Sequence, residues 1–283
     1  MPSDLVFRDA QGTAHRRAAA DARIACLVPS ITELVCDLGL AGQLVARTGF
    51  CIHPREVLNH IPKVGGTKDV DLARLRTLAP THVIVNIDEN EKPCVDEIAT
   101  FVPHVIVTHP NAPQDNIALY RLIGAIFGRE QAAESLSTAL TTALGAALGA
   151  SAAWPREKVL YLIWKDPWMT VAPDTYISRT LATVGWDTVP ARSSVRYPQV
   201  ALLEAAREAA VVLLSSEPFM FRAPHVLALQ AELDAHLPGR HVALIDGEMT
   251  SWYGSRAIRG LGYLPGFRAA CYNSALHSVS PKA

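Results

Sequence analysis

The fold is decided by the stretch Ile24-Ala25-Cys26-Leu27-Val28-Pro29-Ser30-Ile31-Thr32-Glu33-Leu34. Its first half is a short apolar run that stops at Pro29, which is typical of a buried strand. Ser30 and Glu33 have the spacing of a capping box, and apolar residues continue behind them at helical period. We therefore expect a strand, a polar loop and a helix that ends at Gly39.

The same alternation runs through the rest of the first 110 residues. Residues 5–20 are expected to form a small hairpin around a turn at 9–12. Further strands are expected at 43–48, 82–86 and 104–108, and helices at 54–60, 72–78 and 94–101. Strands and helices that alternate at this density indicate an α/β unit with a largely parallel sheet.

One long helical stretch without proline follows, from Asn116 to about Ala153. Glycines weaken a helix, so a break near Gly128-Arg129 is expected, with one long helix over 129–153 behind it. After Pro155 the α/β pattern begins again. Strands are expected there at 158–164, 210–215 and 241–246, and helices at 175–184, 202–208, 223–236 and 255–270.

The two α/β parts share one order of strands and helices without sharing sequence. We expect two Rossmann-like α/β lobes joined by a long backbone helix: an N-terminal lobe at 1–113, a connecting helical segment at 114–153 and a C-terminal lobe at 154–283. Open α/β sheets bind ligands outside the carboxyl ends of their strands, so two such lobes place a ligand in the cleft between them. One long helix with a hinge at each end limits the lobe motion to a few degrees.

Composition excludes several classes of protein. The chain has 283 residues, of which 49% are hydrophobic and 19% charged, which is enough apolar material for a folded core and excludes disorder. Its formal net charge is -1, so there is no global field to hold a nucleic acid. No apolar run is long enough for a transmembrane helix, so no membrane insertion is expected. We expect a monomer that binds a small molecule.

The N-terminus and the cysteines favour a cytoplasmic location. Acidic and polar residues follow Met1 at once, whereas a secretory signal has a basic start and an apolar stretch. A periplasmic protein whose signal peptide has been trimmed would have the same sequence, and this alternative stays open. The five cysteines are odd in number and contain no CxxC, a pattern that suits free thiols in a reducing compartment. They are Cys26, Cys36, Cys51, Cys94 and Cys271.

Polar and aromatic residues gather where the expected strands end. All five tryptophans and six of the seven tyrosines lie from residue 154 onward, so the second lobe is expected to supply flat apolar faces. Each motif also has a plainer interpretation. Ser30 and Glu33 are expected to cap a helix, Gly65-Gly66-Thr67 to form a turn, and Cys51 with His53 to be either a structural pair or part of a soft-metal site.

No catalytic constellation is present in the sequence. There is no G-x-S-x-G, no HExxH, no GxGxxG after a strand and no paired-cysteine metal site. A nucleophile with an obvious base is missing as well, which favours binding over catalysis. We do not expect an enzyme.

Several of these segments resemble a known superfamily. The stretch 24–34, together with 64–68, 80–85, 164–169 and 252–254, is similar to the vitamin B12 and ferric-siderophore binding proteins of ABC importers. These proteins form the helical-backbone metal receptor superfamily, also called class III periplasmic binding proteins. The resemblance covers about residues 5 to 270 and implies two α/β lobes, a rigid connecting helix and a small closure on binding.

The resemblance implies a receptor for a cobalamin-like or metal-chelate ligand. No cofactor is required, and a bound corrinoid or metal chelate would be the ligand itself. The alternative is a metal-binding protein or an enzyme on the same fold that uses Cys51 and His53 as metal ligands. The expected ligand-binding residues are Ser30, Thr48, Cys51, Gly66, Thr67 and Glu89 from the first lobe, and Lys165, Trp168, Tyr176, Tyr197, Glu217, Trp252 and Tyr253 from the second.

The sequence departs from the superfamily at two positions. Relatives that serve a transporter carry an acidic residue on each lobe, where the membrane subunits of the ABC importer dock. Ala73 and Leu203 occupy these positions here, although Glu204 is adjacent to the second. Coupling to importer membrane subunits is therefore left open, and a protein that works in the cytosol without an importer is expected.

Overall fold

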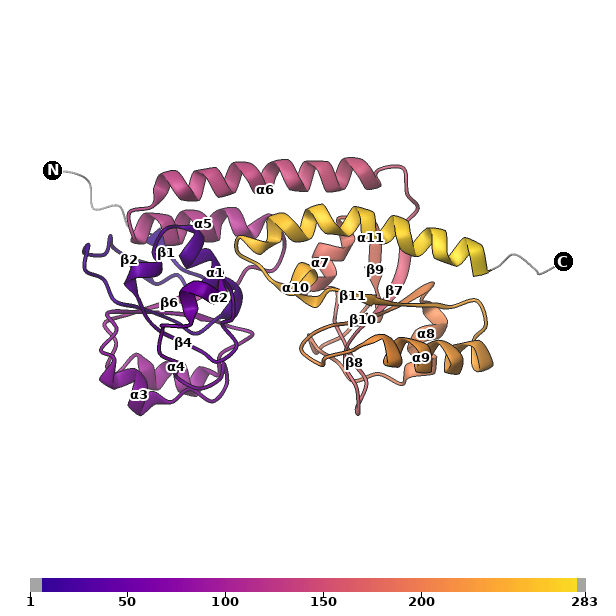
Figure 1. Ribbon diagram of the computed structural model, residues 1–283, viewed down its shortest axis with the longest axis horizontal. Coiled ribbons are helices and arrows are strands. Elements are labelled where there is room, and N and C mark those ends of the chain that lie inside the picture. Colours follow the sequence, from indigo (N-terminus) through magenta and orange to yellow (C-terminus); the bar gives the residue numbers. More distant parts are fainter. Residues whose placement is uncertain (1–6, 279–283) are drawn as a thin grey trace. The chain divides into compact units, whose positions relative to one another are not determined.

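The chain folds into two compact units, which are described separately. The structure is a computed structural model and describes residues 7–278, with the side chains of 7–272. Unit 1 comprises the described residues up to Pro110, Gln114–Leu140 and Tyr253–Arg256. Unit 2 comprises Asn111–Pro113, Thr141–Trp252 and the described residues from Ala257 onward. Figure 1 labels their elements along the chain.

Unit 1 is built on a parallel sheet of four strands. Their order is β4-β3-β5-β6, and every neighbouring pair is parallel. The strands are β3 (Ile24–Cys26), β4 (Leu44–Arg47), β5 (His82–Asn86) and β6 (His104–Thr108). All five residues of β5 are buried, as expected for a strand of a sheet covered on both faces.

Short helices connect these strands. They are α1 (Pro29–Asp37), η1 (Ala41–Gln43), α2 (Arg55–Leu58), α3 (Leu72–Thr77), α4 (Lys92–Ile98) and α5 (Asp115–Ile126). The predicted hairpin is present as β1 (Phe7–Arg8) paired antiparallel with β2 (Ala14–His15). Leu75 of α3 and Ile98 of α4 pack on Val83 and Val85 of β5, so these two helices cover one face of the sheet.

Unit 2 contains a second sheet, which is mostly parallel. β7 (Glu157–Trp164), β10 (Val211–Ser215) and β11 (His241–Ile245) are parallel neighbours, and β9 (Trp186–Thr188) pairs parallel with β7. β8 (Met169–Thr170) pairs antiparallel with β7. The helices are α7 (Tyr176–Ala182), α8 (Leu202–Glu208), α9 (Ala223–His236), α10 (Gly247–Ser251) and α11 (Arg256–Ser278).

Alternate residues of β7 enter two separate cores in unit 2. Val159 and Tyr161 pack with residues of α7 and α11 on one face of the sheet. Leu160 and Leu162 pack with residues of α8 and α9 on the other face. Because successive side chains of a strand point to opposite faces, burial on both faces explains the continuous apolar run at 159–163.

The helix α6 (Glu130–Ser151) is continuous across the boundary between the units, which falls at Leu140 and Thr141. The predicted break before it is confirmed: α5 ends at Ile126, and Gly128 adopts a φ of +66°, which favours glycine. Within residues 7–278, no helix is both long and apolar enough to cross a membrane.

The α/β alternation is confirmed in both units, and three details of the sequence analysis are corrected. Ser30 does not cap a helix, because α1 begins at Pro29 behind Val28 and has no side-chain cap. Tyr253 belongs to unit 1, whereas it was expected in the second lobe. The closing helix α11 extends to Ser278 instead of 270.

Candidate ligand-binding site

The predicted ligand residues of the first lobe lie at the carboxyl ends of the parallel strands of unit 1. Ser30 follows β3, Thr48 and Cys51 follow β4, and Glu89 follows β5. Carboxyl ends of parallel strands meet at one edge of a sheet, which is where open α/β sheets bind ligands.

Cys51 is held inside the loop that follows β4. Its side chain is fully buried, and its Sγ lies 3.1 Å from both Thr32 Oγ1 and Thr48 Oγ1. The Arg47 guanidinium donates to the carbonyl oxygens of Cys51 at 2.9 Å and of Thr48 at 3.2 Å. Burial raises the pKa of the Cys51 thiol, so it stays protonated at neutral pH. Cys51 therefore shapes the loop from within.

The hypothesis of a metal site at Cys51 and His53 gains little from the geometry. His53 is half-buried, two residues beyond Cys51. Among the described residues, no group of three or more His, Cys, Asp or Glu side chains is arranged to hold a metal ion. Because protein metal sites usually have three or four such ligands, the pair would need ligands from a bound molecule.

The loop around Gly66 and Thr67 is tied to the end of β5. Asn90 Nδ2 donates to the Thr67 carbonyl oxygen at 2.8 Å, and Asn90 Oδ1 accepts from the Asn86 backbone at 2.9 Å. A Cβ on Gly66 would lie 2.1 Å from Asp69 Oδ1 and 3.3 Å from Phe50 Cε2. A side chain at this position would therefore displace the Asp69 carboxylate, and the Phe50 ring lies close to the Gly66 backbone.

Tyr253 and Glu89 form a hydrogen bond at the same edge of unit 1. The Tyr253 hydroxyl donates to Glu89 Oε1, and burial raises the pKa of Tyr253, so the phenol remains a neutral donor. Asn116 Oδ1 accepts from the Gly254 backbone at 2.6 Å. Gly254 has a φ of +76°, and a Cβ there would lie 2.9 Å from the Ser30 carbonyl oxygen. Only glycine fits at position 254, where the backbone packs against α1.

In unit 2, predicted ligand residues again follow the carboxyl ends of parallel strands. Glu217 follows β10, and Trp252 follows β11 through the short helix α10. Glu217 Oε1 accepts from Trp252 Nε1 at 2.8 Å and from Ser251 Oγ at 2.7 Å. Burial raises the pKa of Glu217, which these two donors partly oppose. Glu217 therefore orients the indole ring of Trp252.

Lys165 and Trp168 form a second pair after β7. Lys165 Nζ lies 5.9 Å from the centre of the Trp168 ring. The Trp168 ring stacks on Phe221, with 6.0 Å between the centroids and 5° between the planes. This arrangement presents a half-buried aromatic face beside a cation. Tyr176, at the first turn of α7, is buried, and Tyr197 packs at the edge of the core around β7.

Several large apolar side chains at the strand ends and in the loops behind them are exposed, which the sequence alone does not show. Phe50 and Met220 are each 61% exposed, although water disfavours exposed apolar surface. Most of them are apolar residues in polar loops that follow a strand. The set in unit 1 is Phe50, Ile52 and Ile87, and in unit 2 it is Trp164, Val195 and Met220.

Comparisons with known proteins give one consistent result. The family model described as periplasmic binding protein matches residues 24–230. A vitamin B12-binding protein of Photorhabdus laumondii is 25% identical over 187 residues, which are 66% of this chain and 67% of that protein.

Solved structures with the same fold bind related ligands. The periplasmic vitamin B12 binding protein of Vibrio cholerae has a TM-score of 0.77 at 18% identity, over 88% of this chain and 97% of that chain. A periplasmic heme-binding protein of Roseiflexus has a TM-score of 0.75 at 19% identity, over 90% of this chain and 99% of that one. At this level of identity the likeness shows the fold, which has two lobes in these proteins.

Proposed function

The chain belongs to the periplasmic binding protein family, and on that premise we propose that it is a receptor for a corrinoid or another broad, flat metal chelate. A ligand-binding receptor is the function of this family, whose members are solute-binding proteins rather than enzymes. Vitamin B12 and heme, named for the relatives, share a wide ring system around a metal.

The observation that carries the proposal is the exposed apolar set at the strand ends. Five large apolar side chains are exposed in loops that follow parallel strands, and a sixth, Trp164, is exposed at the end of β7 itself. Covering such side chains with a ligand removes apolar surface from water and so stabilises the complex. A flat ring system offers the area to cover several of them. Small polar ligands, such as single amino acids or sugars, would leave most of this surface in water.

The polar residues at the same edges supply the orienting contacts. Lys165 carries a positive charge beside the Trp168 ring, and is suited to the acidic or amide groups at the rim of a chelate. The Tyr253–Glu89 and Trp252–Glu217 hydrogen bonds hold two further aromatic side chains in fixed orientations. Aromatic faces and few polar groups are the usual composition of a small-molecule site.

Equilibrium dialysis against cyanocobalamin, hemin and a ferric hydroxamate chelate tests this function. We expect at least one to bind, and Phe50→Ser to weaken that binding about tenfold or more, because burial of a Phe side chain contributes about 1.5–3 kcal/mol. Leu227→Ser is the matched control, since Leu227 is 72% exposed but lies on α9, away from the strand ends. The absence of binding by all three ligands, or equal losses in both variants, would contradict the proposal.

We further propose that the receptor works in the periplasm with an ABC importer. The family and its relatives favour this alternative over the cytoplasmic location. Ala73 is exposed on α3, and Glu204 is exposed beside half-buried Leu203 on α8, so a carboxylate is available at the second of the two docking positions. Fractionation of the native host tests the location; recovery of the protein with the cytoplasmic fraction alone would overturn it.

A further inference from the structure

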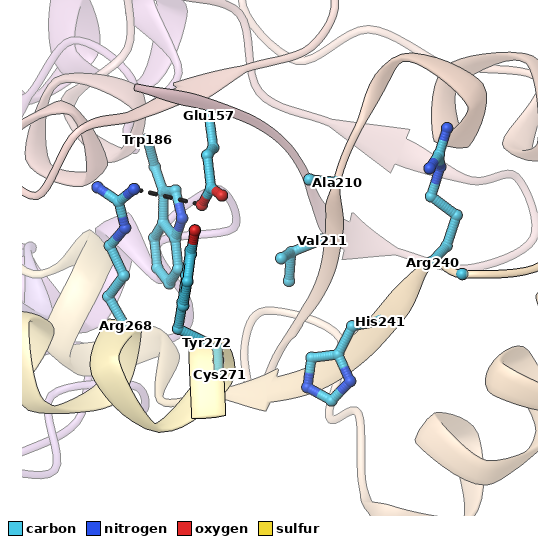
Figure 2. Close-up of a pocket in the computed structure, with 10 residues that line it drawn as sticks. Glu157, Trp186, Ala210, Val211, Arg240, His241, Arg268, Cys271 and Tyr272 are labelled. Atoms are coloured by element: carbon cyan, nitrogen blue, oxygen red, sulfur yellow. Dashed lines mark hydrogen bonds and ion pairs between the residues drawn. The ribbon is translucent and has the colours of Figure 1, made fainter. Parts of the chain in front are cut away.

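A pocket of about 280 Å³ lies at the amino-terminal edge of the unit 2 sheet (Figure 2), the edge opposite to the candidate ligand-binding site. Glu157, Trp186, Val211 and His241, the first residues of β7, β9, β10 and β11, all line it. The remaining lining residues come from α11 and from the chain before β10 and β11. They are Ala210, Gly239, Arg240, Arg268, Cys271 and Tyr272.

The charged groups around the pocket are already compensated within unit 2. Arg268 Nη2 lies 3.2 Å from Glu157 Oε2, and this ion pair stands beside the Trp186 ring in Figure 2. Arg268 also donates to the carbonyl oxygens of Val184 and Pro155. The Arg240 side chain points away from the pocket and donates to carbonyl oxygens of α8. Glu157 thus balances the charge of Arg268, and the charge of Arg240 is directed towards α8 and away from the pocket.

Two further titratable groups of the pocket, His241 and Cys271, are neutral. Burial lowers the pKa of His241 from its ordinary value, so the ring is uncharged at neutral pH. Burial also raises the pKa of the Cys271 thiol to about 11. The lining thus combines apolar surface from Trp186, Val211 and Ala210 with the Glu157–Arg268 ion pair, with Arg240 and with uncharged polar groups.

One polar atom of the lining has no partner. The side chain of Trp186 is 1% exposed, and within the part of the chain that the structure describes, its buried Nε1–H finds no hydrogen-bond acceptor. Buried indole N–H groups are normally hydrogen-bonded, because leaving the donor unpaired costs free energy. A bound molecule with an acceptor would recover that free energy.

We propose that this pocket is a second binding site, for a small uncharged planar molecule whose acceptor atom receives the Trp186 Nε1–H. The volume of about 280 Å³ lies just below the range of about 300–1,000 Å³ for drug-sized sites, so it suits a single ring with one polar substituent. The site is separate from the receptor function, because its lining residues lie at the opposite edge of the sheet.

The test is a titration with benzamide, followed in the NMR spectrum of the tryptophan indole N–H groups. Trp186→Phe identifies the Trp186 signal by its absence. We expect a saturable downfield shift of this signal with benzamide, whose carbonyl oxygen is an acceptor. Toluene, which has no acceptor, should leave it nearly in place. Benzoate has the same shape but a charge, and should bind about tenfold more weakly or worse.

Ala210→Leu provides an independent check that does not touch the buried indole. Ala210 is exposed at the pocket, so a larger side chain there fills the pocket without disturbing the core. We expect it to weaken benzamide binding about tenfold or more while leaving chelate binding at the other edge unchanged. The proposal is overturned if benzamide causes no saturable shift up to its solubility limit, if benzoate binds more tightly, or if Ala210→Leu has no effect.

Discussion

Glu33 and Arg256 form a buried ion pair in unit 1. Both N···O distances are 2.7 Å, and the side chains of Arg256 and Glu33 are only 4% and 12% exposed. Removal of one partner leaves an uncompensated buried charge, so we expect Glu33→Ala to lower the free energy of unfolding by about 3 kcal/mol. Urea denaturation followed by circular dichroism measures this loss.

The exposed Arg121–Glu134 pair has similar hydrogen-bond geometry and serves as a control for the effect of burial on the Glu33–Arg256 pair. Arg121 binds Glu134 through two hydrogen bonds of 3.1 and 3.0 Å, but both side chains are 59% exposed. Water and salt screen such a pair, so Glu134→Ala should leave the urea midpoint almost unchanged. If the two variants lost equal stability, the importance of burial for the Glu33–Arg256 pair would be refuted.

His82 makes unit 1 sensitive to acid. It is buried at the start of β5, stacks on His104 at 4.6 Å, and its Nδ1 lies 2.8 Å from Thr81 Oγ1. Burial, with smaller contributions from His104 and His15, lowers its pKa from 6.5 to about 4. Between these values the unfolded chain binds a proton that the folded chain does not, so stability falls as the pH falls from 6.5 towards 4.

We expect His82→Gln to flatten this pH dependence. The slope of the unfolding free energy against pH should decrease in that window. The decrease is limited to roughly 1 kcal/mol per pH unit, because unfolding at these pH values takes up at most one proton at His82. Urea denaturation of both proteins at a series of pH values measures the slope. An unchanged slope in the variant would show that another group causes the acid sensitivity.

Local sequence could not reveal the role of Glu33. Its spacing from Ser30 suggested a capping box, but its partner Arg256 is 223 residues away. The exposed set that supports the proposed function was missed for a similar reason, because sequence shows that Phe50 is apolar and not that it is exposed. What was predictable was the clustering of the site at the strand ends, since that follows from strand order alone.

At the scale of the elements, the glycines of α5 and α6 have opposite roles. A Cβ on Gly145 would meet nothing within 4 Å, whereas a Cβ on Gly124 would lie 2.6 Å from Ala133 Cβ. We expect Gly145→Ala to stabilise the protein by about 0.5–1 kcal/mol, because alanine loses less backbone entropy in a helix. Gly124→Ala should lower the thermal unfolding midpoint, since α5 would be forced away from α6. Equal shifts in the same direction would contradict this difference.

Elements with a clear local sequence pattern were predictable, and three short elements that lack one were not. β5 and β6 were predicted with their correct bounds, because each has three consecutive apolar residues between polar residues that mark its ends. β8 and β9 were missed, since strands of two or three residues exist only through their pairing with β7. The five-residue helix α10 was missed too, although Asp246 caps it.

For the whole molecule, sequence predicted two α/β parts but not the complete membership of each. The segment Tyr253–Arg256 lies far along the chain, yet it packs in unit 1 through hydrogen bonds to Glu89, Asn116 and Glu33. No local pattern shows such a return of the chain. The cleft between the lobes and the limited lobe motion stay predictions.

The five cysteines decide how the whole chain responds to oxidation. Their odd number favoured a reducing compartment, but burial raises the pKa of each thiol, to about 12 for Cys36 and about 11 for Cys271. The pKa values of Cys26, Cys51 and Cys94 are raised in the same way. Since the thiolate is the reactive form, unpaired thiols of this kind also persist in an oxidising periplasm.

We therefore expect Ellman's reagent at neutral pH to modify the native protein slowly, and all five cysteines quickly once the chain is unfolded. The half-buried Cys36 and Cys94 should react before the three buried cysteines, because access limits the rate when pKa values are all high. The double variant Cys36→Ser/Cys94→Ser should remove this earliest phase, and Cys271→Ser, which changes a buried thiol, should not. Rapid labelling of the buried cysteines in the native protein would contradict this expectation. It would mean that burial does not protect these thiols, because the unit that contains them opens readily.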